Sequence, residues 1–348
     1  MYNTEGDMFM SACQDAKLRI FDTTLGQWKL IKSVDCKDVG WSVLDIDCSH
    51  SGNHIIYSSW SEYIHIVNIR GETETHDALF LDPGPAAYYR TAIFSLRFNQ
   101  DDSEIVAGAN GGYIYIYDRE RKQRTMKIDA HEDDLSGVCF ADNSGHIIYS
   151  GGEDAVVKVW DRRNLKEDNP QPVGQLAGHY DSITHIDSKN DGRYLITNSK
   201  DQSIKLWDIR RFACDEGIKA TKREVARQDW DYRWHPYTGK IIKKKLNGDC
   251  SLMTYYGHSV VRTLIRAKFS PAYNTGQRFI YCGDGIGRVV IYDILTGKIE
   301  RKLEGVGSCG HHKEVIRDVS WHPYENNIVS SGWDGNLIKW ECNSPSEW

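Results

Sequence analysis

The sequence lacks several features that would assign it to common classes of protein. It has no apolar run that approaches membrane-spanning length and no N-terminal stretch with the pattern of a signal peptide. Its nine cysteines are odd in number and include no Cys-x-x-Cys pair, so they do not suit a disulfide framework. We therefore expect a soluble protein with no membrane partner, in the reducing environment of the cytoplasm, the nucleus or both.

An excess of positive charge is also lacking. The formal net charge is -6 and the isoelectric point is about 6.1, which argues against binding to nucleic acid through the overall charge of the chain. The chain has 348 residues, of which 40% are hydrophobic, so it can form a core. Its length exceeds that of an ordinary single domain, although a closed body built from repeats can use such a length.

What is present is a short pattern that occurs twice in nearly full form. Each copy has a histidine, then a small hydroxyl residue, an aspartate four residues later and a Trp-Asp dipeptide after six more. The members are His131, Ser150, Asp154, Trp160 and Asp161 in the first copy, and His179, Thr197, Asp201, Trp207 and Asp208 in the second. This is the signature of a WD repeat, in which about 40 to 45 residues form one four-stranded blade of a β-propeller.

Seven repeats can be aligned on the last residue of the predicted third strand. These residues are Phe21, Val67, Tyr117, Trp160, Trp207, Tyr292 and Trp340. Short runs of β-branched and aromatic residues, separated by Gly, Asp, Asn and Ser, predict antiparallel strands within each repeat. The sequence therefore predicts an all-β fold, a single seven-bladed WD-repeat β-propeller over residues 1–348.

The two end repeats are short. Only about seven residues precede the first predicted strand, at 8–12, and eight follow Trp340, so the chain has no room for an inner strand in the first blade. We count 26 strands, whereas a complete seven-bladed ring has about 28 at four per blade. We expect an incomplete first and last blade, a missing N-terminal segment, and an open sheet edge that favours association.

The recurring His, Ser or Thr, and Asp could form the catalytic triad of a hydrolase. A third copy occurs in the last repeat, as His312, Ser330 and Asp334. A nucleophilic site occurs once, whereas this combination occurs three times, so we interpret it as a structural network that fastens a loop to its blade. Where Ser61, Gly111 and Ile286 replace the aspartate, we expect packing alone to hold the blade. We therefore expect no enzymatic activity.

One loop contains three potential metal ligands, Cys309, His311 and His312. Ligands so close together cannot readily surround zinc without a fourth from elsewhere, and His312 already belongs to the predicted structural network. We predict no metal and no cofactor.

The interval between Trp207 and Tyr292 is nearly twice as long as the others. Residues 251–256 read as the outer strand of blade five, so 211–250 is an insertion, with ten basic and six acidic residues. Its aromatic residues, Trp230, Tyr232, Trp234 and Tyr237, alternate with basic ones, a pattern that suits single-stranded RNA. We favour packing of the rings on the propeller, with the lysines in solvent or facing an acidic partner. A scaffold for RNA or ribonucleoprotein assembly stays the alternative function.

In blades four and five an arginine follows the Trp-Asp dipeptide, two residues after the aspartate. These residues, Arg163 and Arg210, would place two guanidinium groups side by side at the rim, although a local Asp–Arg surface pair is the simpler interpretation. The two endings resemble the docking box by which WD-repeat substrate receptors attach to the damaged-DNA-binding adaptor of cullin-4 ubiquitin ligases.

The resemblance can be narrowed with five further segments, 40–43, 57–65, 230–234, 317–323 and 333–337. Together with the insertion they resemble the WD-repeat protein 23 family of cullin-4-associated factors, over almost the whole chain. The resemblance implies a non-enzymatic receptor that captures protein substrates for ubiquitination. The residues that would face the adaptor are Trp160, Asp161, Arg163, Trp207, Asp208 and Arg210.

Large rings in exposed turns are candidates for a substrate-binding surface. Trp60 and Trp333 lie in predicted turns between second and third strands, and Trp41 lies in the loop before the second blade. Packing against a neighbouring loop is the alternative for these rings. Burial decides between the two interpretations, since rings that are fully buried cannot contact a substrate.

Overall fold

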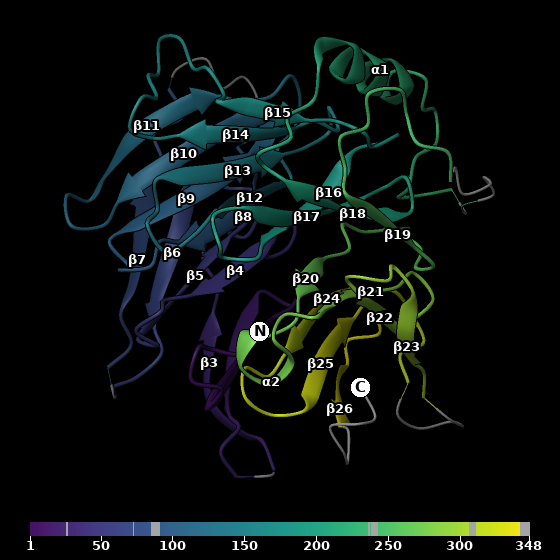
Figure 1. Ribbon diagram of the computed structural model, residues 1–348. Coiled ribbons are helices and arrows are strands. Elements are labelled where there is room, and N and C mark those ends of the chain that lie inside the picture. Colours follow the sequence, from purple (N-terminus) through teal and green to yellow (C-terminus); the bar gives the residue numbers. More distant parts are fainter. Residues whose placement is uncertain are drawn as a thin grey trace.

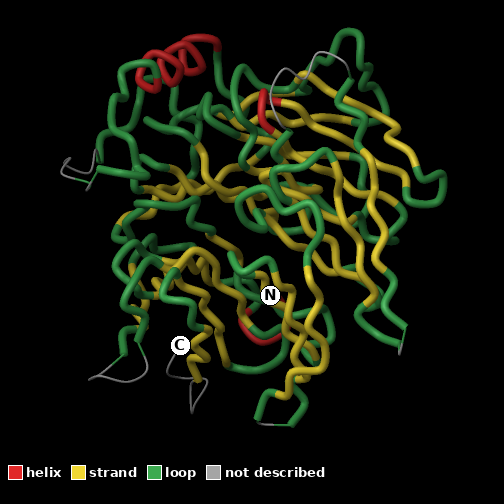
Figure 2. The backbone as a smooth tube through the Cα atoms, turned by 180° about the vertical axis from the view of Figure 1, so that it is seen from behind, coloured by secondary structure: helices red, strands yellow, loops and turns green. Residues whose placement is uncertain are grey.

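The computed structural model describes all residues except 26, 72, 85–90, 236, 238–242, 306–310 and 342–348. The described residues form seven antiparallel sheets arranged as the blades of a propeller (Figure 1). Figure 2 shows the same ring of blades from behind. Within the described part of the chain, the first and last sheets have three strands and the other five have four. The predicted class, an all-β seven-bladed propeller with incomplete first and last blades, is confirmed.

The strands follow the chain blade by blade. The first three blades contain β1 (Met8–Ala12), β2 (Lys17–Asp22) and β3 (Lys29–Asp35); β4 (Asp45–Cys48), β5 (His54–Ser58), β6 (Tyr63–Asn68) and β7 (His76–Phe80); and β8 (Ile93–Phe98), β9 (Glu104–Ala109), β10 (Tyr113–Asp118) and β11 (Gln123–Asp129). Blades four and five contain β12 (Gly137–Phe140), β13 (Ile147–Gly151), β14 (Val157–Asp161) and β15 (Gly174–Leu176); and β16 (Ile183–Ser188), β17 (Tyr194–Ser199), β18 (Ser203–Asp208) and β19 (Met253–Tyr256). Blades six and seven contain β20 (Ala267–Phe269), β21 (Phe279–Gly283), β22 (Val289–Asp293) and β23 (Ile299–Leu303); and β24 (Ile316–Trp321), β25 (Asn327–Gly332) and β26 (Leu337–Glu341).

The residue used to align the repeats is the last but one of the third strand in every blade, from Phe21 in β2 to Trp340 in β26. In blade four this residue, Trp160, packs in a core cluster with Val106 and Ile116 of blade three. The core therefore lies between neighbouring blades, each of which covers a face of the next. This arrangement explains why the strands read as nearly continuous apolar runs.

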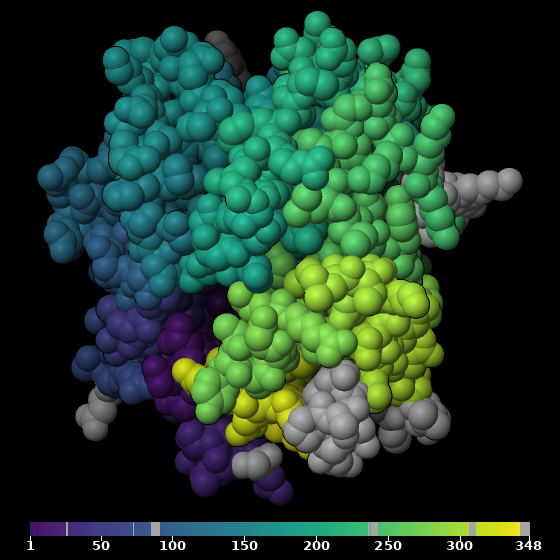
Figure 3. Space-filling view, in the orientation of Figure 1, coloured from purple at the N-terminus to yellow at the C-terminus, as the bar shows by residue number. Residues whose placement is uncertain are grey.

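The first and last blades meet, so the purple and yellow ends of the chain lie side by side in Figure 3. The Tyr2 backbone N–H donates to Ser320 Oγ (3.0 Å), and the Tyr2 hydroxyl donates to Asn327 Oδ1 (2.6 Å). Tyr2 also forms an isolated antiparallel bridge with Phe9 of β1. Tyr2 thus occupies one position beside β1, and the described residues form no inner strand in this blade.

The propeller has two faces, defined by which loops reach them. The loops that enter the first strands and the turns between second and third strands lie on one face, which we call the histidine face. The loops between first and second strands and the turns that leave third strands lie on the other, the arginine face. The short helix α2 (Ala272–Thr275) belongs to the arginine face, in the loop between β20 and β21.

The insertion, 211–250, lies between β18 and β19 and contains the helix α1 (Asp215–Val225). Asp215 and Glu216 lie in the first turn of α1, where acidic side chains suit the helix dipole. Gly217 of α1 lies against the returning chain, since a Cβ there would come within 2.5 Å of the Gly248 carbonyl oxygen. Only glycine permits this close approach. In the described part of the chain, neither α1 nor α2 is long and apolar enough to cross a membrane.

Beyond α1 the insertion crosses onto the histidine face. The Arg262 backbone N–H donates to the Tyr232 carbonyl (2.6 Å), and the Tyr180 hydroxyl donates to the Lys244 carbonyl (2.9 Å). Lys200 Nζ lies 4.4 Å from the centre of the Tyr232 ring. The predicted packing of aromatic rings on the propeller thus applies to Tyr232, whereas Trp234 is exposed.

Candidate docking and substrate faces

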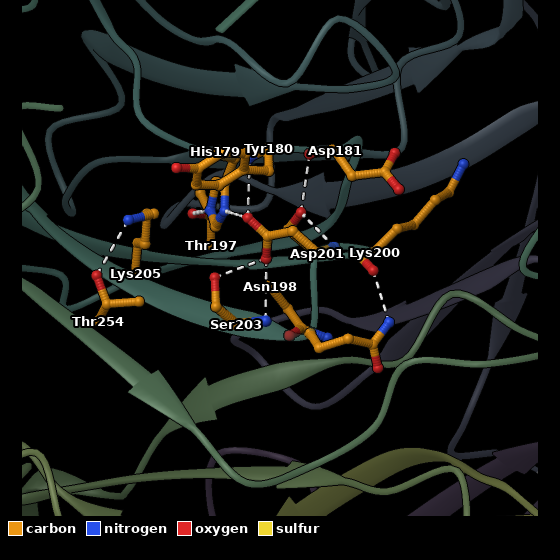
Figure 4. A network of polar contacts seen from close by, with 12 residues as sticks. His179, Tyr180, Asp181, Thr197, Asn198, Lys200, Asp201, Ser203, Lys205 and Thr254 are labelled. Carbon is orange, nitrogen blue, oxygen red and sulfur yellow. Dashed lines mark hydrogen bonds and ion pairs between the residues drawn. The ribbon is translucent and has the colours of Figure 1, made fainter. Parts of the chain in front are cut away.

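A network of four buried side chains holds the loop before β16 to the rest of blade five, and Figure 4 shows three of them, His179, Thr197 and Asp201. His179 Nδ1 lies 2.8 Å from Asp201 Oδ2, and His179 Nε2 lies 2.6 Å from Thr197 Oγ1. The Trp207 indole N–H donates to the same hydroxyl at 2.8 Å. We call this arrangement of His, Ser or Thr, Asp and Trp the tetrad.

The structure brings together the same tetrad in blades four and seven. Its members there are His131, Ser150, Asp154 and Trp160, and His312, Ser330, Asp334 and Trp340. The three hydroxyl residues have no exposed surface, so a substrate cannot reach them as nucleophiles. Each hydroxyl instead links the histidine to the indole. This geometry gives a physical reason to interpret the tetrads as structural.

The aspartates of the tetrads are ionised. Burial alone would raise the pKa of Asp201, but the adjacent His179 and the hydrogen bonds that the carboxylate accepts lower it to about 2. Against the same opposing effect of burial, the hydrogen bond from His312 lowers the pKa of Asp334 to about 2. Each carboxylate therefore stays an acceptor at neutral pH and fixes the orientation of its histidine.

Blade six lacks the aspartate of the pattern but has a substitute. Asp284 lies two residues before Ile286, and its Oδ1 accepts hydrogen bonds from the Ser259 backbone N–H (2.9 Å) and hydroxyl (2.5 Å). Arg288 Nε donates to the other oxygen at 2.8 Å. The expectation that this blade relies on packing alone is therefore wrong, because a carboxylate two residues earlier in the chain holds the same loop.

Arg163 lies on the arginine face, held by the aspartate of its own repeat. The strand β14 ends at Asp161, so the arginine stands in a turn rather than on a continuing strand. The Arg163 backbone N–H donates to Asp161 Oδ1 (3.0 Å), and its guanidinium contacts both carboxylate oxygens, at 2.9 and 2.6 Å. The hydrogen bond from this guanidinium lowers the pKa of Asp161 to about 2.

Arg210 repeats this geometry in blade five. Its Nε and Nη2 lie 3.1 and 2.9 Å from the two carboxylate oxygens of Asp208, which also accepts from Arg193 Nη2 at 2.8 Å. The side chains of Arg163 and Arg210 are each 63% exposed. Each arginine therefore pairs with the aspartate of its own repeat and is still accessible to a partner.

Three of the six predicted adaptor-facing residues, Trp160, Trp207 and Asp208, are buried. Trp160 and Trp207 are each 1% exposed and belong to the tetrads. Their contribution to any docking is to hold the turn that follows, while Arg163 and Arg210 present the surface. The prediction that these two tryptophans face a partner is wrong for this structure, because each ring is buried against the preceding blade.

Another Asp-x-Arg sequence, Asp231-Tyr232-Arg233, occurs in the insertion, on the opposite face. Arg233 Nε and Nη2 lie 2.9 and 2.8 Å from the two oxygens of Asp231, and the Arg233 backbone N–H donates to Asp231 Oδ1 at 2.9 Å. The closed pair therefore also forms away from the arginine face, although not in every Asp-x-Arg sequence, since the guanidinium of Arg193 contacts Asp208 rather than Asp191. Its position on two adjacent blades, rather than its internal geometry, distinguishes the pair on the arginine face.

The arginine face carries apolar side chains that the repeat pattern did not predict. In blade six the position equivalent to Arg163 and Arg210 is Leu295, which is 81% exposed. Tyr273 of α2 and Tyr324 of the next blade are exposed, and their rings meet edge to face with centroids 5.1 Å apart. Exposed apolar groups gathered on one face are typical of an interaction surface. The repeat alignment could have revealed Leu295, because it occupies an arginine position.

Hydrogen bonds between loops join this face across blades four to seven. Asn190 Nδ2 donates to Asn143 Oδ1 (2.7 Å), which links blade five to blade four. Gln277 Nε2 donates to the Lys189 carbonyl (3.1 Å), which links blade six to blade five. Asn274 Nδ2 donates to the Glu325 carbonyl (3.0 Å), which links blade six to blade seven. The arginines and the tyrosine pair therefore stand on one connected surface.

The substrate-face candidates lie on the histidine face and are exposed. The exposed fractions are 74% for Trp41, 37% for Trp60 and 53% for Trp333. Burial of Trp60 and Trp333 would have excluded them as substrate contacts, but neither ring is buried. Trp60 also borders a pocket of about 300 Å³ between the loop before β4 and the turn between β5 and β6.

The candidate metal ligands do not come together as a described site. Cys309 lies outside the described residues, and His312 is engaged in the tetrad of blade seven. Among the residues that the structure describes, no group of three His, Cys, Asp or Glu side chains could hold a metal ion.

The seven sheets and the repeated tetrads define the class of protein as a WD-repeat β-propeller. The model of the WD domain, G-beta repeat, matches residues 122–161, 170–208 and 303–341. The LEC14B protein of Lithospermum erythrorhizon is 40% identical over 354 residues, which cover 99% of this chain and 72% of that protein. The DDB1- and CUL4-associated factor 11 homologue of Caenorhabditis elegans is 40% identical over 356 residues, 99% of this chain and 61% of that protein.

The chain belongs to the WD-repeat family that includes these two proteins, which confirms the resemblance to cullin-4-associated factors. Human pre-mRNA-processing factor 17 is more distant, at 20% identity over 349 residues, 98% of this chain and 49% of that protein. The chain spans about three fifths of the length of the nematode relative.

Proposed function

We propose that this chain is the propeller of a substrate receptor for a cullin-4 ubiquitin ligase and has no catalytic activity of its own. The observation that carries the proposal is the pair of exposed arginines, Arg163 and Arg210, on adjacent blades of one face. It is supported by the relatives named DDB1- and CUL4-associated factor 11 homologues. The partner on the arginine face is then the adaptor DDB1, the damaged-DNA-binding adaptor of the ligase.

The chemistry of the two arginines suits such docking. Each guanidinium has five N–H donors and uses some of them on its own aspartate, so others remain for acceptors of a partner. An arginine that loses its water at the centre of an interface contributes about 2 kcal/mol or more to binding. An exposed Asp–Arg pair contributes at most about 1 kcal/mol to folding. Docking and folding roles can therefore be separated by experiment.

The test is the double substitution Arg163→Ala and Arg210→Ala. We expect the affinity for purified DDB1 to fall at least about tenfold, which corresponds to about 1.4 kcal/mol. The melting temperature should change by no more than about two degrees, because a chain of this size responds weakly to 1 kcal/mol. Arg233→Ala is the matched control, since Arg233 has the same closed geometry on the opposite face. Unchanged capture by the double variant, or equal loss in the control, contradicts the proposal.

Protein substrates would bind the histidine face, opposite the adaptor. Trp41, Trp60 and Trp333 are the candidate contacts, because their rings are exposed there. The seven cysteines among the described residues are free thiols. This supports the further proposal that the protein acts in the cytoplasm, the nucleus or both.

The alternative function, a scaffold in ribonucleoprotein assembly, is favoured by one observation. Trp234 and the lysines at 243–245 are exposed in the same insertion, where a ring and positive charge could hold single-stranded RNA. The receptor proposal predicts no retardation of a labelled single-stranded RNA by the chain. A retardation that weakens as salt is raised would favour the alternative.

A further inference from the structure

The pocket on the histidine face combines aromatic rings with negative charge. It is lined by two aromatic residues, Trp60 and Tyr63, and two acidic residues, Asp38 and Glu62, together with Val39, Gly40, Ser61 and Thr91. The lining contains two carboxylates and no lysine or arginine. Its volume, about 300 Å³, leaves room for a side chain of a partner.

The two carboxylates are not neutralised by the protein. Within the described part of the chain, neither Asp38 nor Glu62 is paired with a lysine or an arginine. The basic side chain in contact with Asp38 is His65, whose Nε2 lies 3.0 Å from Asp38 Oδ2. Burial, reinforced by the nearby His76, lowers the pKa of His65 to about 4, so its ring is neutral at pH 7. The pocket therefore keeps its negative charge.

His65 also shows that the polar groups behind the pocket are not fully satisfied. The ring is buried and stacks on Tyr57 with centroids 4.9 Å apart and planes 10° from parallel. Among the described residues, its Nδ1 has no hydrogen-bond partner, whereas its Nε2 faces Asp38 Oδ2. A buried polar group without a partner is uncommon and calls for an explanation. Asp38 lines the pocket, and its side chain is 55% exposed.

The walls of the pocket are already in place. The Gly40 backbone N–H donates to Ser59 Oγ (3.1 Å), which in turn donates to the Ser42 carbonyl (2.8 Å). Gly40 lies so close to Trp60 that a Cβ on Gly40 would be 2.7 Å from the Trp60 Cβ. The Trp60 ring meets Phe94 edge to face, with centroids 6.0 Å apart. A pocket with fixed walls does not need to be ordered when a ligand binds.

We propose that this pocket binds the cationic side chain, lysine or arginine, of a protein partner. A cation against the face of Trp is attracted by the electrons of the ring, and two carboxylates at the same site add charge attraction. An acidic side chain would be repelled, and a neutral one would gain only the apolar contact. Trp41, exposed beside the pocket, can then cover the partner backbone. The inference rests on the proposed function only in identifying this partner as the substrate.

The experiment measures binding of short peptides to the whole chain by titration calorimetry. The probes are acetylated and amidated Gly-Gly-Lys-Gly-Gly, its arginine counterpart, and a norleucine counterpart that has the same length without the charge. We expect the lysine or arginine peptide to bind at least tenfold more tightly than the norleucine peptide and to weaken as ionic strength rises. Equal affinities for all three peptides, or no binding of any at millimolar concentration, overturn the proposal.

Substitutions assign the binding to the pocket. Glu62→Gln changes charge at nearly constant shape, and Trp60→Ala removes the ring, so each should weaken the lysine or arginine peptide at least fivefold. Ile286→Ala is the control, because Ile286 is an exposed apolar residue on the same face but outside the pocket. Unchanged binding in Glu62→Gln, with the fold intact by melting temperature, overturns the proposal. The adaptor takes no part in this assay, so the outcome is separate from capture of DDB1.

Discussion

Replacing Asp201 by alanine should weaken the whole propeller, because this carboxylate is the acceptor for four donors. His179 Nδ1 lies 2.8 Å from it, the Tyr180 and Ser203 backbone N–H groups donate at 3.0 Å each, and the Ser203 hydroxyl donates at 2.6 Å. The His179 side chain has no exposed surface. Its Nδ1–H would therefore be left buried without a partner.

The magnitude follows from those donors. A buried donor without an acceptor costs about 1 to 3 kcal/mol, and Ser203, which is also buried, adds to this. We expect the free energy of unfolding to fall by about 2 to 4 kcal/mol. With an unfolding entropy of about 2.1 cal/mol/K per residue over 348 residues, the melting temperature should fall by about 3 to 6 °C.

Thermal unfolding followed by circular dichroism measures the effect, and Asp35→Ala is the control. Asp35 is exposed and pairs with Lys17 at the surface, so its loss should change stability by no more than about 0.5 kcal/mol. If Asp201→Ala and Asp35→Ala have the same melting temperature, the tetrad does not hold the blade.

The effect of Asp201 should also depend on pH with a definite sign. Its pKa in the folded protein, about 2, is lower than the value of 3.8 for an unperturbed carboxyl group. The stabilisation is therefore complete above about pH 4 and is lost as the pH falls through about 2. The difference in stability between the parent and Asp201→Ala should narrow over this range.

Three further outcomes are expected. Burial raises the pKa of Asp187 to about 6, so the unfolding free energy contributed by this group falls as the pH rises from about 4 to 6, and Asp187→Asn should remove that slope in urea unfolding. Asp284→Ala should lower the melting temperature, whereas Ile286→Ala, at an exposed side chain, should not; equal melting would refute the substitute network of blade six. Leu295→Ala with Tyr273→Ala should weaken DDB1 capture without a change in melting temperature, and unchanged capture would restrict docking to the arginines.

The fold is predictable because each repeat of the sequence corresponds to one physical unit. The aligned residue is buried between blades in blades two to six and partly buried in the first and last, so aligning the repeats on it gives the number and order of the blades. The tetrad is predictable for the same reason, since its members have fixed spacings around each Trp. Asp284 is not predicted in this way, because it lies two residues before the aspartate position of the repeat, although it binds the equivalent loop.

The surfaces are less predictable, because exposure depends on segments far apart in the chain. The meeting of Tyr273 with Tyr324 depends on two loops in different blades. The path of the insertion onto the histidine face depends on Tyr232 reaching Arg262, which no local pattern indicates. The burial of Trp160 depends on blade three, so a Trp-Asp-x-Arg sequence alone does not say which of its residues meets a partner.

Because Arg163 and Arg210 are each paired with their own aspartate, they should lose less conformational entropy when a partner binds. A free arginine loses up to about 2 kcal/mol of conformational entropy when it is fixed in one rotamer. Here the backbone turn and the bidentate contact restrict that freedom during folding, before any partner arrives. A partner that binds this face meets two guanidinium groups that are already held in one orientation. Its affinity therefore depends on placing acceptors at the spacing of these two groups, rather than on ordering mobile side chains.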